Sequence, residues 1–150
     1  MRVNEVMSQP AITCSRTTSL RIATWMLREH DIGFLLVVDE LWNRTLMGVV
    51  TDRDMCLTGL GEEHDPTLTS VEDCMTTDVI TCPPDTDARQ VVSLMAEHRV
   101  RRIPVVDRDG NIRGVVGICD LIEHKAVPDS EICEVLSRIM KPRLAHAEAA

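Results

Sequence analysis

Two seven-residue segments with the same spacing each end in an aspartate. The first runs from Gly48 to Asp54 (GVVTDRD) and the second from Gly114 to Asp120 (GVVGICD). In each, an apolar stretch typical of a strand runs into the expected start of a helix. An ionised carboxylate accepts strong hydrogen bonds, and the N–H groups of a helix start suit an anion. Thr51 and Asp54 therefore have the chemistry of a polar binding site; the alternative is that they only cap the helix.

The second segment has glycine, Gly117, at the position that Thr51 occupies in the first. The difference removes one hydroxyl group, and a hydrogen bond of that kind contributes roughly 0.5–1.5 kcal/mol net. The missing side chain also leaves room for a ligand. We therefore expect Asp120 to keep a binding role with one contact fewer around it.

Basic side chains that could contact phosphate gather in two places. Arg99, Arg101 and Arg102 form one cluster, and Arg53 lies inside the first segment. Arginine suits bidentate contact with phosphate. In the repeat described below, the stretch that corresponds to the cluster, residues 31–34, is neutral to acidic, so we expect phosphate binding to be asymmetric. The alternative for the cluster is a solvated charged turn.

Six cysteines and five histidines could supply metal ligands or redox-active thiols. No C-x-x-C pair is present, whereas structural zinc sites usually have such closely spaced ligands. Cys14 with Cys82, and His30 with His98, occupy equivalent positions in the repeat described below, so a site assembled from distant ligands stays an alternative. We predict no metal site, and we interpret these residues as reduced core thiols and helix-end histidines.

The composition excludes several classes of protein. The chain has 150 residues, a net charge of −8 and 2% aromatic residues. The acidic balance argues against a general nucleic-acid binder, which needs a basic surface. No apolar stretch approaches the roughly 20 residues of a membrane span, and no signal peptide or familiar catalytic motif is present. We therefore expect a cytoplasmic protein without enzymatic activity and with an aliphatic core.

The sequence repeats itself at a nearly constant offset. A shift of 68 residues aligns three short segments of the first half with the second, and a shift of 66 aligns a fourth. One small change of offset at a turn is what duplication followed by loop drift would produce. The aligned segments are 3–7 with 71–75, 12–14 with 80–82, 37–39 with 105–107, and 48–54 with 114–120.

Each repeat has the pattern of a strand, a helix, two paired strands and a second helix. Ser19 and Asp87 are good helix N-caps, and apolar residues follow each at helical spacing. Residues 107–111 contain the Asp-Gly pair that favours a tight hairpin turn. A unit of about 50 residues buries little surface alone, so we expect the two repeats to pack together. The expected limits are 1–60 for the first repeat, 61–70 for a linker, 71–127 for the second repeat and 128–150 for a C-terminal helix and tail.

These segments resemble the signature of the cystathionine-β-synthase (CBS) domain. Residues 102–107, 110, 114–116 and 120 carry the resemblance in the second repeat, and residues 37–39 and 48–54 carry it in the first. The chain is similar above all to stand-alone bacterial CBS pairs, including a hypoxic-response type. The resemblance implies an α/β (α+β) fold of two β-α-β-β-α repeats, packed sheet to sheet with pseudo-two-fold symmetry. It also implies two clefts between the repeats that bind adenosine ligands.

The resemblance assigns roles to individual residues. The two aspartates would bind ribose hydroxyls, the arginines would reach phosphate, and two strand threonines would line the clefts where backbone groups contact adenine. The alternative for those threonines is ordinary strand propensity. Because aromatic residues are few, we expect aliphatic walls and backbone groups, not stacking, to hold the adenine. The predicted ligand-binding residues are Thr13, Thr51, Arg53, Asp54, Thr81, Arg101, Arg102, Pro104 and Asp120.

Together these observations predict a regulatory module that binds AMP, ADP, ATP, NAD or S-adenosylmethionine. AMP is the expected ligand, and no cofactor is required. A second copy of the chain is the expected partner, in a disc-shaped homodimer, and an effector protein is a further candidate partner. Two alternatives stay open: a ligand-free interaction scaffold, and a metal- or redox-responsive stress protein.

Overall fold

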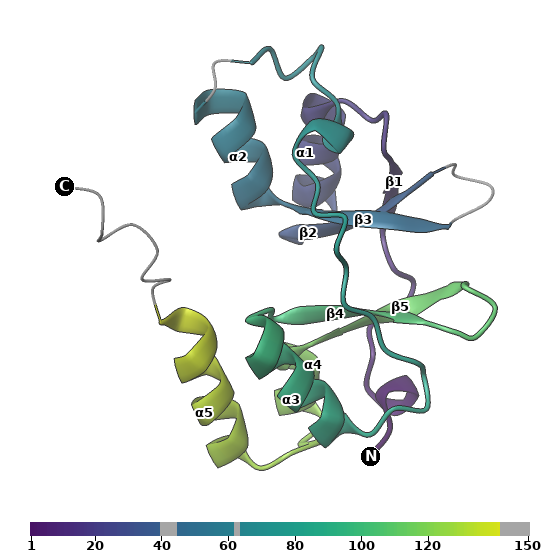
Figure 1. Ribbon diagram of the computed structural model, residues 1–150, viewed down its shortest axis with the longest axis vertical. Helices are drawn as coiled ribbons and strands as arrows, with labels where there is room; N and C mark the ends of the chain where they lie inside the picture. The colour runs from purple at the N-terminus through teal and green to yellow at the C-terminus, as the bar shows by residue number, and fades with distance from the viewer. Residues whose placement is uncertain (40–44, 62–63, 142–150) are drawn as a thin grey trace.

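The computed structural model describes residues 1–39, 45–61 and 64–141 and contains two similar repeats (Figure 1). The first repeat consists of β1 (Thr13–Ser15), α1 (Leu20–Glu29), β2 (Phe34–Val38), β3 (Leu46–Thr51) and α2 (Asp52–Gly61). The second consists of α3 (Ala88–His98), β4 (Arg102–Val106), β5 (Ile112–Gly117) and α4 (Ile118–Glu123), and is followed by α5 (Asp129–Met140). A short 3-10 helix precedes each repeat: η1 (Val3–Glu5) and η2 (Val71–Asp73).

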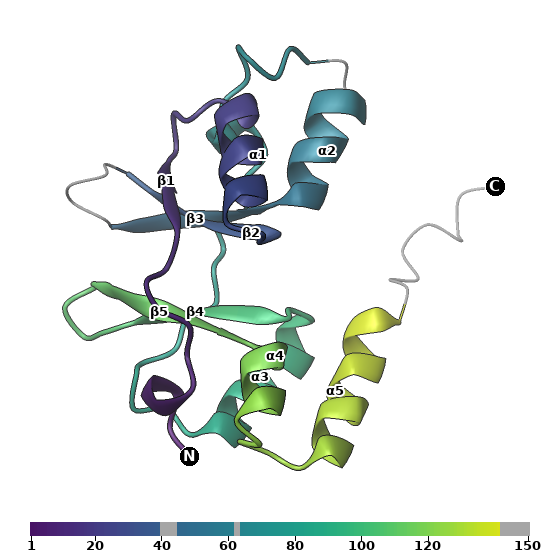
Figure 2. The same cartoon turned by 180° about the vertical axis from the view of Figure 1, so that it is seen from behind.

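The two sheets face each other across the middle of the molecule, and helices cover their outer sides (Figures 1 and 2). α1 and α2 lie over the first sheet, whereas α3 and α4 lie over the second, and α5 packs beside α3 and α4. Each sheet therefore has its own aliphatic core, one built around Leu20, Leu35 and Val50 and the other around Val91 and Ile103. This arrangement confirms the predicted α/β architecture of two repeats packed sheet to sheet.

The first strand is where the two sheets differ. β1 pairs in parallel with β2, which pairs antiparallel with β3. In the second repeat, the extended segment expected at 79–82 forms one isolated bridge, between Cys82 and Val105, beside the β4–β5 pair. A proline explains why the second repeat lacks this strand. In the first repeat the Arg16 N–H donates to the carbonyl of Val38 at 3.0 Å. The equivalent position of the second repeat holds Pro84, which has no N–H to donate.

The segment that precedes each repeat in the chain, residues 3–8 for the first and 71–76 for the second, is called its lead-in. Each lead-in packs into the core of the repeat that it does not precede. Val3 and Val6, which precede the first repeat, are buried among the side chains of the second. Val71, which precedes the second repeat, is buried in the core of the first. The same backbone bonds fix both segments: the Val3 N–H donates to Thr86 at 2.9 Å, and the Val71 N–H donates to Thr18 at 2.8 Å. The 1–60 boundary predicted for the first repeat thus includes a segment that packs in the second.

Each lead-in continues along a sheet edge and forms one isolated β-bridge there, next to a glycine of the sheet. The backbone of Ser8 pairs with Val115 on β5, and that of Thr76 pairs with Val49 on β3. A Cβ atom on Gly114 would lie 2.7 Å from the Ser8 carbonyl oxygen. A Cβ atom on Gly48 would lie 2.8 Å from the Thr76 carbonyl oxygen. Both glycines of the repeated motif are therefore needed for close backbone approach.

The local signals at helix starts and at the second hairpin form as predicted. The Ser19 side chain accepts a hydrogen bond from the Ile22 N–H, and Asp87 accepts one from the Arg89 N–H. In the hairpin, the Asp107 carboxylate accepts the Asn111 N–H at 2.9 Å, and this bond holds the pKa of Asp107 below its usual range. α4 is a short helix and ends at Glu123.

The C-terminal helix expected after residue 128 is present as α5 and covers α3. Ile132 and Val135 are buried against the second core, and an ion pair of 3.7 Å joins Arg89 to Glu131. The Arg99 guanidinium donates to the carbonyl of Lys141 at the end of α5. Within the described parts of the chain, no helix is long and apolar enough to cross a membrane.

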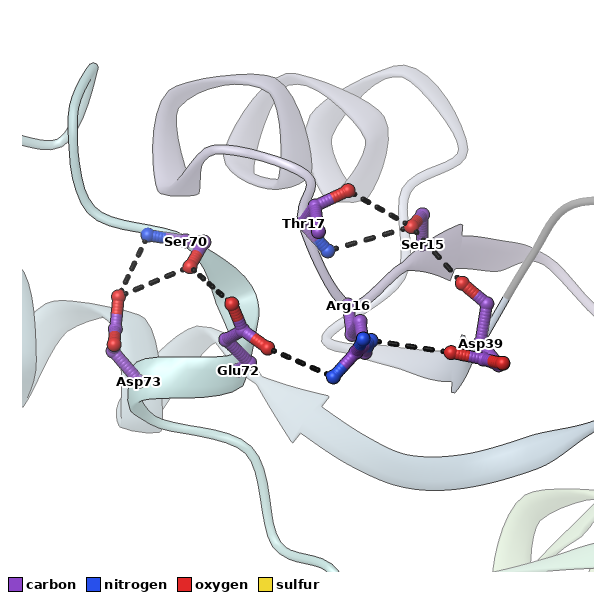
Figure 3. A network of polar contacts seen from close by, with 7 residues as sticks. All are labelled: Ser15, Arg16, Thr17, Asp39, Ser70, Glu72 and Asp73. Atoms are coloured by element: carbon purple, nitrogen blue, oxygen red, sulfur yellow. Dashed lines mark hydrogen bonds and ion pairs between the residues drawn. The ribbon is translucent and has the colours of Figure 1, made fainter.

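A polar network fastens η2 to the first repeat (Figure 3). Arg16 lies between two carboxylates, with its Nε 3.1 Å from an oxygen of Asp39 and its Nη1 3.4 Å from an oxygen of Glu72. The backbone adds a bond from the Glu72 N–H to the Arg16 carbonyl at 3.0 Å. The lead-in of the second repeat is thereby attached to the end of β2.

Candidate functional site

A cavity of about 140 Å³ lies between the two repeats. One wall comes from the segment before β1 and from the start of β2, and the other comes from β4, β5 and α4. Because both repeats contribute, a molecule in this cleft would contact both. The lining residues are Ser8, Pro10, Ala11, Ile12, Ile32, Phe34, Arg102, Val115, Gly117 and Asp120.

Asp120 is held in this cleft by two donors, one from the segment that precedes the first repeat and one from the start of its own helix. The Ser8 hydroxyl donates to Oδ1 of Asp120 at 2.8 Å. The Gly117 N–H donates to Oδ2 at 2.6 Å. Ser8 itself is fixed by backbone pairing with Val115. The carboxylate is thereby oriented at the boundary between the repeats, where it can accept hydrogen bonds from hydroxyl groups of a ligand.

The rest of the cleft is mostly apolar and nearly neutral. Arg102 and Asp120 are the charged residues of its lining, and their charges cancel. Ile12, Ile32 and Phe34 form an apolar wall. Phe34 is the only phenylalanine of the chain. The apolar lining is mainly aliphatic, as expected, and it adds one aromatic ring that is available for a planar base. That aliphatic walls and backbone groups hold the adenine stays a prediction.

The equivalent aspartate of the first repeat, Asp54, has a different surrounding. Oδ2 of Asp54 accepts the Thr51 N–H at 3.0 Å and the Thr51 hydroxyl at 2.7 Å. The Asp54 N–H donates back to the Thr51 hydroxyl oxygen at 3.2 Å. These are reciprocal capping bonds. Neither residue lines the Asp120 cleft or the more open hollow near the hairpin turns. The binding role of Thr51 and Asp54 stays a prediction, since Asp120 makes the same bond to the N–H three residues before it.

The predicted arginines are dispersed. Arg102 lines the cleft at Asp120. Arg101 is exposed, and its carbonyl accepts the Ile118 N–H at 3.1 Å. Arg53 is exposed on α2. The structure therefore brings one of the three predicted phosphate contacts, Arg102, together with Asp120.

The remaining predicted residues lie outside this cleft. Pro104 is buried in β4, and its carbonyl accepts the Cys82 N–H at 3.1 Å. Thr13 lies in β1 opposite Leu36. Thr81 lines the open hollow near the hairpin turns, which has a volume of about 290 Å³. That hollow contains no charged side chain among its lining residues, which are Thr45, Leu46, Met47, Thr77, Val79, Thr81, Val106 and Gly110.

The cysteines and histidines do not gather into a metal site within residues 1–39, 45–61 and 64–141, where no group of three potential ligands is found. Cys14 and Cys82 are buried, one in each core, and burial raises the pKa of each thiol to about 11. Such thiols are poor nucleophiles at neutral pH.

The structure adds Ser8 and Phe34 to the predicted site. Ser8 follows Met7. The sequence could point to Ser8 only if it were known that the lead-in of the first repeat packs on the second repeat. Phe34 occupies the position that Arg102 has in the second repeat. The shift of 68 residues therefore contained the signal for Phe34, because it aligns this ring with a predicted contact.

Comparison with known proteins adds a family match and several relatives. The model of the CBS domain matches residues 3–58 and 71–127. An uncharacterized protein of Methanopyrus kandleri is 31% identical over 121 residues, which are 81% of this chain and 61% of that protein. Hypoxic response protein 1 of Mycobacterium tuberculosis is 28% identical over 132 residues, covering 87% of this chain and 89% of the relative. These matches confirm the resemblance to stand-alone CBS pairs.

Two solved structures are similar in fold and contain ligands. The CBS domain pair of protein MJ0100, in complex with 5′-methylthioadenosine and S-adenosyl-L-methionine, has a TM-score of 0.74 and 28% identity. It covers 83% of this chain and 95% of that one. CBSX2 in complex with AMP has a TM-score of 0.70 and 28% identity, with the same two coverages.

Proposed function

The chain belongs to the CBS domain family, and from that premise we propose that it is a regulatory module that binds an adenosine-containing ligand between its repeats. The observation that carries the proposal is the cleft at Asp120, which both repeats line. Relatives of the same fold bind 5′-methylthioadenosine, S-adenosyl-L-methionine and AMP. The family match occupies most of the chain, so a regulatory role is favoured over catalysis.

The side chains of the cleft suggest how the ligand is held. Asp120 accepts hydrogen bonds from ribose hydroxyls, in competition with the hydroxyl of Ser8, which now occupies Oδ1. The base lies against Phe34 and the neighbouring isoleucines. Arg102 then faces the 5′ substituent from the remaining side of the lining.

The charge of the cleft favours a ligand with little negative charge. Arg102 is the one cation of its lining, and an arginine can bind one phosphate group through two hydrogen bonds. A triphosphate would leave most of its charge without a partner. We therefore keep AMP as the expected ligand, ahead of ATP, as a regulatory ligand and not a required cofactor.

The size of the cleft makes binding a conformational event. Ligand pockets usually begin at ~300 Å³, and this cavity has about 140 Å³. We infer that a nucleotide extends through the open mouth of the cleft and also widens it on binding. A ligand that binds the opened state more tightly shifts the population toward it, and this shift is the regulatory output.

Isothermal titration calorimetry and thermal unfolding with AMP, ATP and S-adenosylmethionine test the proposal. A ligand at 100 times its Kd stabilises the folded state by roughly 2.7 kcal/mol. We expect heat of binding and a raised Tm with AMP. If none of the three ligands gives heat or changes Tm, the ligand-free scaffold is the better function.

The homodimer, the effector protein and the cytoplasmic location stay predictions. α1 exposes Ile22 and Trp25, each with more than half of its surface accessible, so this helix is where a dimer contact is best tested. Light scattering of the wild type and of Trp25→Arg measures the mass; a monomer in both would exclude the predicted homodimer. Elemental analysis tests the metal-responsive alternative, which requires bound zinc.

A further inference from the structure

The C-terminal helix α5 lies outside the part of the chain that the family match covers. The match ends at residue 127, and α5 begins at Asp129. Near its start the helix is packed firmly, since Ile132 is 3% exposed and belongs to the second core. Nearer its end, Leu136 and Ile139 are only partly buried against that core. The last turns are therefore the less firmly packed part of α5.

A side chain from the turn between α3 and β4 holds this end of α5. The Arg99 guanidinium donates to the carbonyl of Lys141 and, at 3.5 Å, to that of Ile139. The helix ends at Lys141 in extended backbone, with φ −60° and ψ 130°, and not in the left-handed cap that often satisfies the last carbonyls. A cation at the C-terminus of a helix is also favoured by the helix dipole. Arg99 therefore takes the place of such a cap.

The backbone of Arg99 shows that its side chain matters. Arg99 is the C-cap residue of α3 and has φ 55° and ψ 42°. This left-handed conformation is unfavourable for most residues, and glycine, asparagine and aspartate adopt it most readily. The equivalent residue of the first repeat, Asp31 with φ 50°, follows that preference. An arginine at this position is therefore explained by what its guanidinium binds.

The same turn reaches the ligand cleft three residues later, where Arg102 is part of the lining. Between the two arginines, the Val100 N–H donates to a carbonyl of α3 at 3.1 Å, and the Arg101 carbonyl accepts the first N–H of α4 at 3.1 Å. Three residues span at most about 11 Å. Because this short segment is bonded to the helices on either side, a shift of Arg102 is passed on to Arg99.

We propose that the end of α5 is the output of the ligand cleft and that Arg99 connects the two. A phosphate group bound by Arg102 draws the start of β4 toward the cleft. The turn follows, the Arg99 guanidinium leaves the carbonyls of α5, and the last turns of that helix loosen. The apolar side chains of Leu136 and Ile139 are then exposed. This inference rests on the proposed function and adds the element that carries its regulatory output.

Hydrogen exchange of the full chain, with and without saturating AMP, tests the proposal. Ligand binding alone stabilises the folded state and slows exchange, so an increase confined to one helix reports a local release. We expect AMP to raise the exchange rate of the amides at residues 136–141 at least about fivefold and to leave that of α1 equal or slower. Unchanged or slower exchange at 136–141 with bound AMP would overturn the inference and leave the proposed function standing.

Adenosine provides the control for the phosphate, because it offers no phosphate group to Arg102. Bound adenosine should leave the exchange at residues 136–141 equal to that of the free chain. An increase as large as that with AMP would overturn the role of Arg102 as the trigger.

Arg99→Asn tests the connection itself, because asparagine tolerates the left-handed backbone and lacks the guanidinium. Without ligand, this variant should exchange at residues 136–141 as fast as AMP-bound wild type, and AMP should add no further increase. Since coupling between two sites is reciprocal, the variant should also bind AMP more tightly than wild type, by up to the factor through which AMP loosens α5.

Asp31→Asn is the matched variant at the equivalent position of the first repeat and should change neither the exchange of α5 nor the Kd for AMP. Exchange at residues 136–141 as slow in Arg99→Asn as in wild type would show that Arg99 does not hold α5. Absence of AMP binding to wild type in calorimetry would remove the proposed function and, with it, the coupling to α5.

Discussion

The two repeats differ in what covers their first helix. In the first repeat the outer face of α1 is exposed to solvent, whereas in the second α5 packs on the equivalent face of α3. On α1, Thr24 is exposed, and on α3 the equivalent Val92 is buried beside the α5 side chains. At the next position along each helix the more apolar residue belongs to the first repeat, because α1 carries Trp25 where α3 carries Ser93. Two copies of one backbone plan have therefore acquired different surfaces through a few side chains.

The two aspartates give the same lesson at the site. Asp54 and Asp120 follow equally spaced motifs, and each accepts the N–H of the residue three positions earlier. Asp54 also accepts the hydroxyl of Thr51, whereas Asp120 accepts the hydroxyl of Ser8. Architecture is fixed by positions that both repeats share, such as the two glycines at the sheet edges. We expect ligand binding to depend on positions at which the repeats differ. The following experiments test that separation, from the largest expected effect to the smallest.

Removing the contact between α5 and the second core should have the largest effect on stability. Ile132 is 3% exposed, and truncation of a buried isoleucine to alanine costs about 2–5 kcal/mol. Ile22 on α1 is 53% exposed, so Ile22→Ala should stay within about 0.5 kcal/mol of wild type. Urea denaturation measures both variants. Equal losses would show that the first repeat also covers its outer face.

Asp120 and Asp54 should differ in their contribution to ligand binding. A hydrogen bond to a charged group contributes about 1.5–3 kcal/mol, so Asp120→Asn should raise the Kd for AMP by roughly 10- to 150-fold. Asp54→Asn should leave the Kd within about twofold, because Asp54 does not line the Asp120 cleft. Titration of both variants decides the matter, and a larger loss in Asp54→Asn would reverse the assignment of the site.

The sequence could predict the fold because the offset of 68 residues repeats whole elements with their caps and turns. The sequence could not predict that each lead-in packs in the other repeat, because Val3 and Val71 are apolar and would suit either core. The site is harder still. The bond that distinguishes Asp120 joins it to Ser8, 112 positions away, and depends on how the lead-in crosses β5. Equal spacing in the two motifs gave no reason to prefer Asp120.

The two sheet-edge glycines should be equally sensitive to a methyl group. Their added Cβ atoms would lie 2.7–2.8 Å from backbone oxygens that side-chain rotation cannot move. Overpacking costs about 1–3 kcal/mol, so Gly48→Ala and Gly114→Ala should each lose stability in that range. Gly61→Ala is the control, since its Cβ would meet no atom within 4 Å. A loss in one variant but not the other would show that the lead-ins are held unequally.

The buried thiols offer a property that both repeats should share. The pKa of Cys14 and Cys82 is raised from 9.0 to about 11 in the folded state, chiefly by burial. The folded state therefore holds the thiol proton more tightly, and this contribution is complete below pH 9 and is lost as the pH rises toward 11. The loss should be about 1–2 kcal/mol for each thiol.

Denaturation under reducing conditions at pH 8, 9, 10 and 11 measures this slope. Cys14→Ala and Cys82→Ala should each flatten it by a similar amount, because other titrating groups are the same in all three proteins. An unchanged slope in either variant would mean that its thiol is not protected by burial.

The smallest effect is expected from the network around Arg16, which has no counterpart in the second repeat, where Pro84 occupies the equivalent position. Its two ion pairs, with Asp39 and Glu72, are about half exposed, and exposed pairs contribute about 0.2–1 kcal/mol each. Arg16→Met keeps the apolar stem and should lose about 0.4–2 kcal/mol in total, the sum of the two pairs. The loss should be smaller in 1 M salt because screening already weakens the pairs. The backbone bond from Glu72 to Arg16 survives the substitution, so η2 should stay in place, and hydrogen exchange of its amides measures this directly. Fast exchange in Arg16→Met would show that the arginine, and not the shared backbone bonds, holds the lead-in on the first repeat.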